Sequence, residues 1–118
     1  MTRSPGALST PAFERVRAYV EHNLGGNVSL AALAEVAGVS RFHFARLFRL
    51  RTGESPLGYV RRMRIERAKE LLRRSRLRIA TLAQTLSFAD QSHFTRAFQS
   101  SVGMTPARYA RLQSGTGA

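Results

Sequence analysis

The side chains best suited to binding a charged partner lie in one short stretch, residues 40–49. Placed on a helix of about 3.6 residues per turn, this stretch divides into an apolar stripe and a second, small and basic stripe. The apolar stripe is Phe44, Leu47 and Phe48, and the second stripe is Phe42, Ala45, Arg46 and Arg49. Arginine carries a planar fork of N–H donors that pairs with phosphate oxygens or with the acceptor edge of guanine. The pattern indicates a helix that buries one face and offers the other to a polyanion.

The residues before this helix place it in a larger motif. Ser40 is a good N-cap, because its hydroxyl can accept a hydrogen bond from a free N–H group of the first turn. Ala37-Gly38-Val39 is typical of a helix that ends at glycine and continues through a tight turn. A helix, a glycine turn and a capped helix with one apolar and one basic face together predict a helix-turn-helix.

The same pattern recurs further along the chain. Shifted by 50 residues, the first set aligns with the second: His43, Phe44, Arg46, Phe48, Gly53, Pro56 and Tyr59 with His93, Phe94, Arg96, Phe98, Gly103, Pro106 and Tyr109. Upstream the offset is 49, so the second turn has gained one residue, and Asp90 replaces Ser40 as the N-cap. Two copies of one unit joined by a connector are the predicted organisation.

Caps, prolines and glycines predict an all-α protein with about seven helices and no sheet. The expected helices cover residues 11–23, 30–37, 41–51, 56–74, 79–86, 91–101 and 106–112. Thr10 is expected to cap the first of them. Arg78 is a poor cap, so the start of the fifth helix is expected to fray.

These helices predict five segments. The segments are a disordered N-terminal tail at 1–10, a first helix-turn-helix subdomain at 11–55, a long connector helix at 56–74, a second helix-turn-helix subdomain at 75–112 and a C-terminal tail at 113–118. In the connector, the apolar residues alternate with arginines: Tyr59, Val60, Met63, Ala68, Leu71 and Leu72 with Arg61, Arg62, Arg64, Arg67, Arg73 and Arg74.

Positive charge is concentrated in the middle of the chain. The net charge is +12, and residues 41–78 carry thirteen basic against three acidic residues, a net charge of +10. Charge of one sign in one region repels itself and is typical of proteins that bind a polyanion. A plainer interpretation is a soluble, arginine-rich protein from a high-GC genome, since arginine outnumbers lysine 18 to 1.

Several function classes are excluded or disfavoured. The chain has no cysteine, which excludes a disulfide, a thiol nucleophile and a thiolate metal site. No paired carboxylates or nucleophile–base set appears, so we expect no enzyme and no cofactor. His43 and His93 each precede a core phenylalanine and lack a second ligand at a suitable spacing, so we expect no metal. No apolar run approaches the roughly 20 residues that span a membrane, and residues 1–9 lack the apolar core of a signal peptide, which fits a cytoplasmic protein.

Four segments carry a resemblance to a known family. They are residues 66–72 (Glu-Arg-Ala-Lys-Glu-Leu-Leu), Ile79-Ala80 with Leu82-Ala83, residues 88–98 (Phe-Ala-Asp-Gln-Ser-His-Phe-Thr-Arg-Ala-Phe) and residues 103–109 (Gly-Met-Thr-Pro-Ala-Arg-Tyr). Residues 71–109 resemble the AraC/XylS family of bacterial transcription regulators, and residues 30–59 match the family's other helix-turn-helix. The resemblance covers about residues 11–111.

The chain departs from the family pattern in three places. Ser87 stands where the second turn usually has glycine, which questions the left-handed geometry of that turn. Arg78 replaces the usual small capping residue. Many members carry a separate effector-binding and dimerisation domain, whereas here only a short tail precedes Pro11. The chain therefore resembles the small members that are a DNA-binding domain alone, or a DNA-binding half expressed by itself.

The resemblance implies a sequence-specific, double-stranded DNA-binding transcription regulator. The connector would hold two recognition helices about one turn of DNA apart, roughly 34 Å, so that one monomer reads an asymmetric site. The expected base-reading residues are Phe42, Ala45, Arg46, Gln91, Thr95, Arg96 and Gln99. The expected phosphate-binding residues are Arg41, Arg49, Arg61, Arg62 and Ser92. An activator would also need a surface for RNA polymerase, and the sequence does not locate one.

Each assignment has an alternative. Arg46 and Arg96 could be ordinary solvated residues, and Phe42 could pack on the first helix instead of on DNA. The arginines of the connector could form a merely solvated face. The alternative function is non-specific nucleic-acid binding, to RNA for example, or a helical protein-interaction module, and it predicts little preference between DNA sequences.

Overall fold

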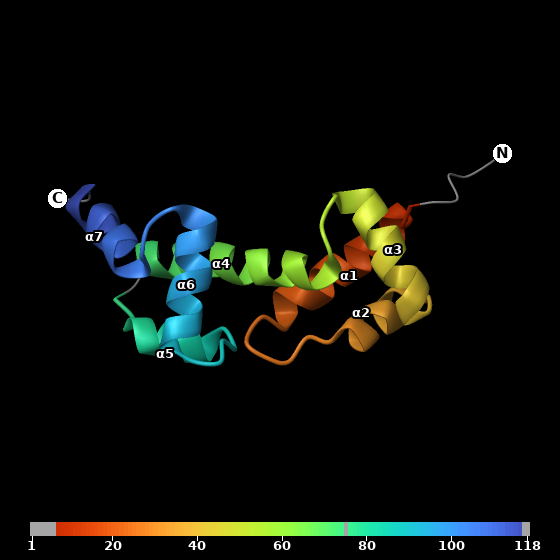
Figure 1. Cartoon of the computed structure of the whole chain (residues 1–118), viewed down its shortest axis with the longest axis horizontal. Coiled ribbons are helices and arrows are strands. Elements are labelled where there is room, and N and C mark those ends of the chain that lie inside the picture. The colour runs from red at the N-terminus through yellow and green to blue at the C-terminus, as the bar shows by residue number, and fades with distance from the viewer. Residues whose placement is uncertain (1–6, 75, 117–118) are drawn as a thin grey trace. The chain divides into compact units, whose positions relative to one another are not determined.

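The computed structural model of the chain describes residues 7–74 and 76–116, and its secondary structure there is entirely helical. Seven helices follow one another without an intervening strand in these residues (Figure 1). They are α1 (Thr10–His22), α2 (Leu30–Ala37), α3 (Arg41–Thr52), α4 (Pro56–Arg74), α5 (Ile79–Thr85), α6 (Gln91–Val102) and α7 (Pro106–Thr116). The predicted all-α class with about seven helices is confirmed.

Short polar side chains begin most of the helices. Each of these side chains accepts a hydrogen bond from the backbone N–H three residues ahead, at 2.8–3.2 Å: Ser29, Ser40, Ser55, Asp90 and Thr105. Arg78, before α5, makes no such bond with its side chain, as predicted. The prediction of Thr10 as the cap of α1 is wrong. Ser9 caps that helix by accepting a hydrogen bond from the Ala12 N–H at 3.2 Å. Pro11 fits within the first turn, because proline has no N–H and the N–H groups of a first turn have no acceptor within the helix.

The chain is ordered over more residues at both ends than the sequence predicted. Leu8 is only 4% exposed, and its carbonyl oxygen accepts a hydrogen bond from Arg51 Nη1 at 3.1 Å. Leu8, Ser9 and Thr10 are thus held by the fold, whereas the sequence predicted a disordered tail at 1–10; residues 1–6 lie outside the described part. Helix α7 continues to Thr116, beyond the predicted limit at Leu112, and residues 117–118 of the predicted C-terminal tail also lie outside it.

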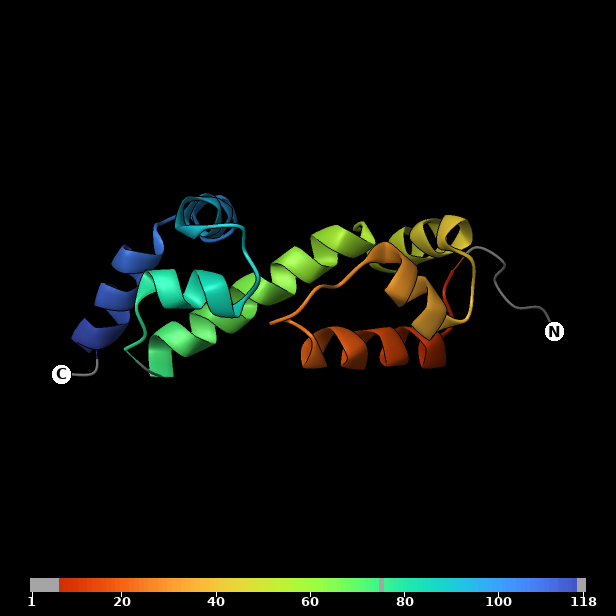
Figure 2. The same cartoon turned by 90° about the horizontal axis from the view of Figure 1, so that it is seen from below.

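Packing divides the chain into two compact units, one ending at Arg61 and the other beginning at Arg62. The first unit is built around α2, which packs against both α1 and α3 (Figure 2). Its core holds four aromatic rings whose neighbouring centroids lie 5.3–6.3 Å apart: Phe13, Phe44, Phe48 and Tyr59. Tyr59 belongs to the first turn of α4, so this end of the long helix is part of the first unit.

In the second unit the central helix is α6, the counterpart of α3, and it packs against α5 and α7. Phe94 and Phe98 are fully buried, with their ring centroids 5.8 Å apart, and Tyr109 lies 5.6 Å from Phe98. These three rings match Phe44, Phe48 and Tyr59 of the first unit, as the repeat predicted. In each unit, a buried aromatic pair fixes the rotation of one helix, so that the opposite face of that helix points outward.

Candidate nucleic-acid interface

The turns before α3 and α6 begin with the same left-handed backbone conformation and the same hydrogen bonds. Gly38 has a φ of 81°, and its N–H donates to Glu35 O while the next N–H donates to Ala34 O, both at 3.1 Å. Ser87 has a φ of 62° and makes the matching bond to Gln84 O at 3.1 Å. Serine therefore keeps the left-handed geometry that glycine adopts in the first turn, although a side chain there costs about 1–2 kcal/mol.

Helix α3 presents a cationic face that also carries one phenyl ring. Its buried side is formed by Phe44 and Phe48, which have no exposed surface. On the other side Arg41, Phe42, Arg46 and Arg49 are exposed, and Ala45 is half-buried. Phe42 is 87% exposed, so the alternative that it packs on α1 is wrong. The structure thus brings the predicted α3 residues together on one accessible surface.

Helix α6 presents a polar face with a single arginine at the corresponding positions. Gln91, Ser92, Arg96 and Gln99 are exposed, and Thr95 is half-buried. Four of these residues line an open depression on the surface: Gln91, Ser92, Thr95 and Arg96. The face therefore offers amide and hydroxyl groups around a single guanidinium, a set suited to hydrogen bonding with base edges.

The two histidines at matching positions have different surroundings. His43 is exposed, while His93 is half-buried with its ring edge-on to Phe88 at a centroid distance of 5.3 Å. The Nδ1 atom of His93 accepts a hydrogen bond from the Ala89 N–H at 3.4 Å. His93 therefore packs against the turn before α6 and accepts a hydrogen bond from it. Within the described residues, no three His, Cys, Asp or Glu side chains are placed to hold a metal ion.

The arginines of α4 fall into distinct environments. Arg61 and Arg62, which the sequence assigned to phosphates, are exposed. Arg64 is half-buried, and this burial lowers its pKa, although a guanidinium stays protonated in proteins. Further along the helix, Arg74 pairs with Glu70 at 3.0 Å, and Arg73 donates to the Tyr109 hydroxyl at 3.2 Å. The last turns of α4 thus use their arginines within the fold.

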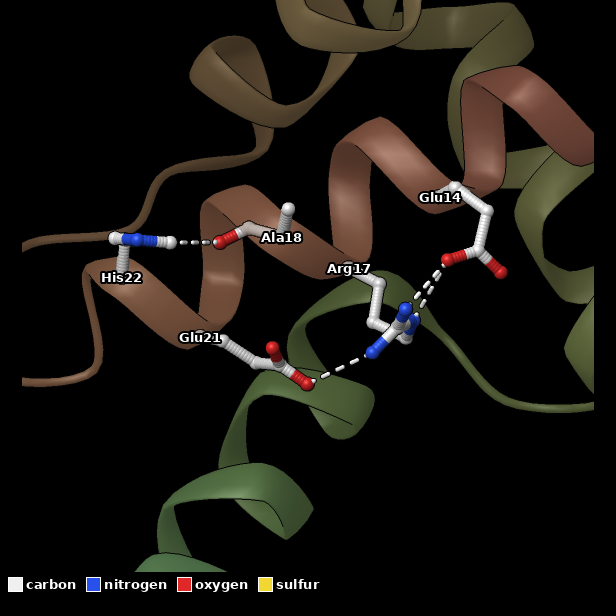
Figure 3. Close-up of polar contacts among 5 residues, drawn as sticks. All are labelled: Glu14, Arg17, Ala18, Glu21 and His22. Carbon is white, nitrogen blue, oxygen red and sulfur yellow. Dashed lines mark hydrogen bonds and ion pairs between the residues drawn. The ribbon is translucent and has the colours of Figure 1, made fainter.

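The arginines of α1 are also used within the fold. Arg17 lies between Glu14 and Glu21, at 2.6 and 3.0 Å (Figure 3). The hydrogen bond that Arg17 donates to Glu14 is the main cause that raises the pKa of Arg17. Arg15 donates through Nε to Val36 O at 3.1 Å and through Nη2 to Ala37 O at 3.3 Å, and so caps the end of α2. These pairings leave α3 as the main cationic face of the first unit.

Two further residues share the outward faces and were missed by the sequence interpretation. Leu50, one turn after Arg46, is 57% exposed, and Ser100, one turn after Arg96, is also exposed. Helical periodicity could have identified both, because each lies four residues beyond a predicted base-reading arginine. Arg51 was also missed: besides binding Leu8 O, its guanidinium lies over the Phe13 ring, 4.9 Å from the centroid.

Comparisons with known proteins match this arrangement. A helix-turn-helix domain family matches residues 33–112. The TetD protein of transposon Tn10 from Escherichia coli is 33% identical over 102 residues, which cover 86% of this chain and 74% of TetD. The transcriptional activator AarP from Providencia stuartii is 32% identical, covering 97% of this chain and 84% of AarP. The arabinose operon regulatory protein of Escherichia coli is 33% identical over 107 residues. The chain belongs to the AraC/XylS family of transcription regulators.

Solved structures of the AraC/XylS family agree with this assignment. The DNA-binding domain of AdpA, solved in complex with a target DNA, is 30% identical and covers 92% of this chain and 96% of that domain, with a TM-score of 0.82. An AraC-type regulator from Chromobacterium violaceum gives a TM-score of 0.83 at 25% identity, covering 87% of this chain. The chain spans only about a third of some longer relatives, for example 37% of LumQ from Photobacterium leiognathi. The predicted family resemblance is confirmed.

Proposed function

We propose that the chain is a sequence-specific, double-stranded DNA-binding regulator that inserts α3 and α6 into successive segments of the major groove. The observation that carries this proposal is the matched design of the two helices. Each buries a phenylalanine pair and exposes an arginine, Arg46 or Arg96, on the opposite face. An exposed helix face after a tight turn is the element that a helix-turn-helix places in the groove. The AdpA domain, which is similar to this chain, was solved in complex with a target DNA, and this supports DNA binding.

The base-reading roles follow from side-chain chemistry. Arg46 and Arg96 would each pair bidentately with O6 and N7 of a guanine. Gln91 and Gln99 would pair with N6 and N7 of adenine, because an amide has one donor and one acceptor side by side. The remaining proposed contacts are apolar and meet thymine methyl groups: Phe42, Ala45 and Thr95.

The phosphate-binding roles fall to other exposed residues. They are Arg41, Arg49, Arg61, Arg62 and Ser92. Such contacts hold the protein in register on the duplex and carry no sequence information themselves. Free N–H groups at the first turns of α3 and α6 would add donors for phosphate oxygens.

Several finer parts of the proposal concern the whole protein. One chain carries two non-identical recognition helices, which supports binding as a monomer to an asymmetric site. Control of transcription would further require a contact with RNA polymerase. We expect no enzymatic activity, and we expect the protein to act in the cytoplasm, where a bacterial chromosome lies. The described residues contain no helix that is long and apolar enough to cross a membrane.

The test is a selection of random duplex DNA on the purified chain, followed by measurement of the stoichiometry on the enriched site. We expect one chain per site and two conserved blocks about one helical turn apart. Arg46→Ala and Arg96→Ala should each relax one block and weaken binding by about 1–3 kcal/mol. Arg17→Ala is the matched control, because it removes an exposed arginine that pairs with Glu14 and Glu21 outside the proposed interface.

The selection also tests the alternative function. If no sequence is enriched while duplex DNA and RNA bind equally well, the base-reading roles are wrong, and the basic helices form a general polyanion surface. Salt dependence alone does not separate the two functions, because both depend on phosphate contacts.

A further inference from the structure

Phe42 is the most exposed large apolar side chain of the described residues. Its ring is 87% exposed, whereas the other exposed large apolar residues are leucines with 39–57% of their surface exposed. A phenyl group held in water is unfavourable, and burying it on a partner would be favourable. The rotation of α3 is fixed by Phe44 and Phe48, so the outward position of Phe42 is built into the first unit. No side chain of the described residues covers Phe42, so its apolar surface is available to a partner.

The neighbours of Phe42 identify where that partner lies. Arg46 is one turn further along the same face, and Arg41 and Arg49 are also exposed nearby. A ring surrounded by guanidinium groups suits a polyanion with a small apolar feature. In the major groove, that feature is the C5-methyl group of a pyrimidine, because the other groups on the base edges are hydrogen-bond donors and acceptors.

We propose that Phe42 senses the pyrimidine C5-methyl group itself, so that the first unit binds thymine or 5-methylcytosine at one position more tightly than cytosine. This inference rests on the proposed major-groove function. Both bases carry the same methyl group at the same ring position, and a phenyl ring makes no hydrogen bond that would separate them. Methylation of a cytosine in the site would then strengthen binding by the first unit.

The helix geometry limits where the methyl group lies. Side chains four residues apart on a helix have Cβ atoms about 5–6 Å from each other. Successive bases are about 3.4 Å apart along one strand. The methyl group read by Phe42 therefore lies within about two base pairs of the guanine read by Arg46. The second unit has Ser92 at the corresponding position, so its block should not respond to methylation through that residue.

The experiment uses the DNA site enriched by the whole chain. Each thymine in the block that Arg46→Ala relaxes is replaced in turn by deoxyuridine, which keeps the base pair and lacks only the methyl group. We expect one replacement to weaken binding about fourfold, the size expected when one methyl group is no longer buried. At the same position, cytosine and 5-methylcytosine opposite guanine form a second pair, and we expect 5-methylcytosine to bind more tightly by a similar factor.

Two variants assign the effect to Phe42. In Phe42→Ala the thymine-to-deoxyuridine ratio at that position should fall to about 1, while Arg17→Ala, which lies outside the proposed interface, should leave it unchanged. Phe42→Ala should fold normally, because the ring is exposed, and an unchanged melting temperature checks this.

Three outcomes would overturn the inference. These are a site with no methyl-sensitive thymine, methyl effects at every thymine that are unchanged in Phe42→Ala, and a thymine effect that Phe42→Ala removes without any gain from 5-methylcytosine at that position. Each of them leaves sequence-specific DNA binding intact. A methyl effect at a second thymine that survives in Phe42→Ala would belong to Ala45. A selection that enriches no site at all would instead contradict the proposed function.

Discussion

The two units share one scaffold and differ in the chemistry that the scaffold presents. Three aromatic rings of each core match position by position, Phe44, Phe48 and Tyr59 with Phe94, Phe98 and Tyr109, and so do Arg46 and Arg96. Around these arginines, however, the exposed residues of the two helices differ: Arg41, Phe42, Arg49 and Leu50 on α3 correspond to Gln91, Ser92, Gln99 and Ser100 on α6. The outward face of the first unit is therefore strongly cationic and partly apolar. That of the second carries one arginine among neutral hydrogen-bonding groups.

This difference separates two contributions to DNA binding. Guanidinium groups on phosphates release counterions, so their contribution falls steeply as the salt concentration rises. Amides on base edges discriminate between sequences by about 1–3 kcal/mol per bidentate pair and depend less on salt. If both helices enter the groove, we expect the first unit to supply most of the salt-dependent affinity and the second to supply discrimination.

The largest expected effect comes from breaking the shared scaffold in either unit. Phe48→Ala and Phe98→Ala should each destabilise the protein by about 3–5 kcal/mol, because each ring is fully buried among other aromatic rings. Urea denaturation, monitored by circular dichroism, measures the change in the free energy of unfolding. Phe42→Ala is the matched control, with an expected change within about 0.5 kcal/mol. If Phe48→Ala cost no more than this control, the aromatic cluster would not be the core of the first unit.

The positions of the helices could be predicted from sequence because the signals that begin them are local. Six polar side chains accept from an N–H three residues ahead, and such pairs are visible in a short window of sequence. Because the pattern occurs twice, the core residues of one unit also indicated the core residues of the other. The bounds of α2 and α4 were predicted without error, while α7 was predicted four residues too short.

The remaining errors involve contacts between residues far apart in the chain. The bond from Arg51 to Leu8 O joins residues 43 apart, and it holds a segment that composition alone marks as a tail. Likewise, the sequence of α4 does not reveal that Arg73 donates to Tyr109, 36 residues later. Such pairings depend on how helices pack, which no local window contains. The roles of individual side chains toward bases and phosphates stay predictions, because they depend on a partner outside the chain.

The two turns offer a smaller effect that sharpens the comparison. Gly38→Ser should destabilise the first unit by about 1 kcal/mol, because a residue with a side chain is strained at a φ of 81°. A Cβ atom added at Gly38 would meet no atom within 4 Å, so backbone strain is the only expected cost. Ser87→Gly should stabilise the second unit by up to about 1 kcal/mol, since it relieves the same strain at a φ of 62°. Thermal melting measures both changes, and a destabilised Ser87→Gly would show that the serine side chain makes a compensating contact.

The smallest expected effect concerns salt and exchanges one residue between the two faces. Arg49→Gln gives α3 the residue that α6 carries at Gln99, and Gln99→Arg does the reverse. Each phosphate contact contributes about 0.9 to the slope of log K against log salt concentration, so Arg49→Gln should lower the slope by about that amount. Gln99→Arg should raise the slope and reduce the preference for the enriched sequence, because a phosphate contact replaces a base contact. Binding titrations at four or more salt concentrations, on the enriched site and on an unrelated duplex, measure both quantities. Equal slopes for the starting protein and both variants would mean that neither position faces a phosphate. The proposal that the first unit supplies most of the salt-dependent affinity would then be wrong for this position.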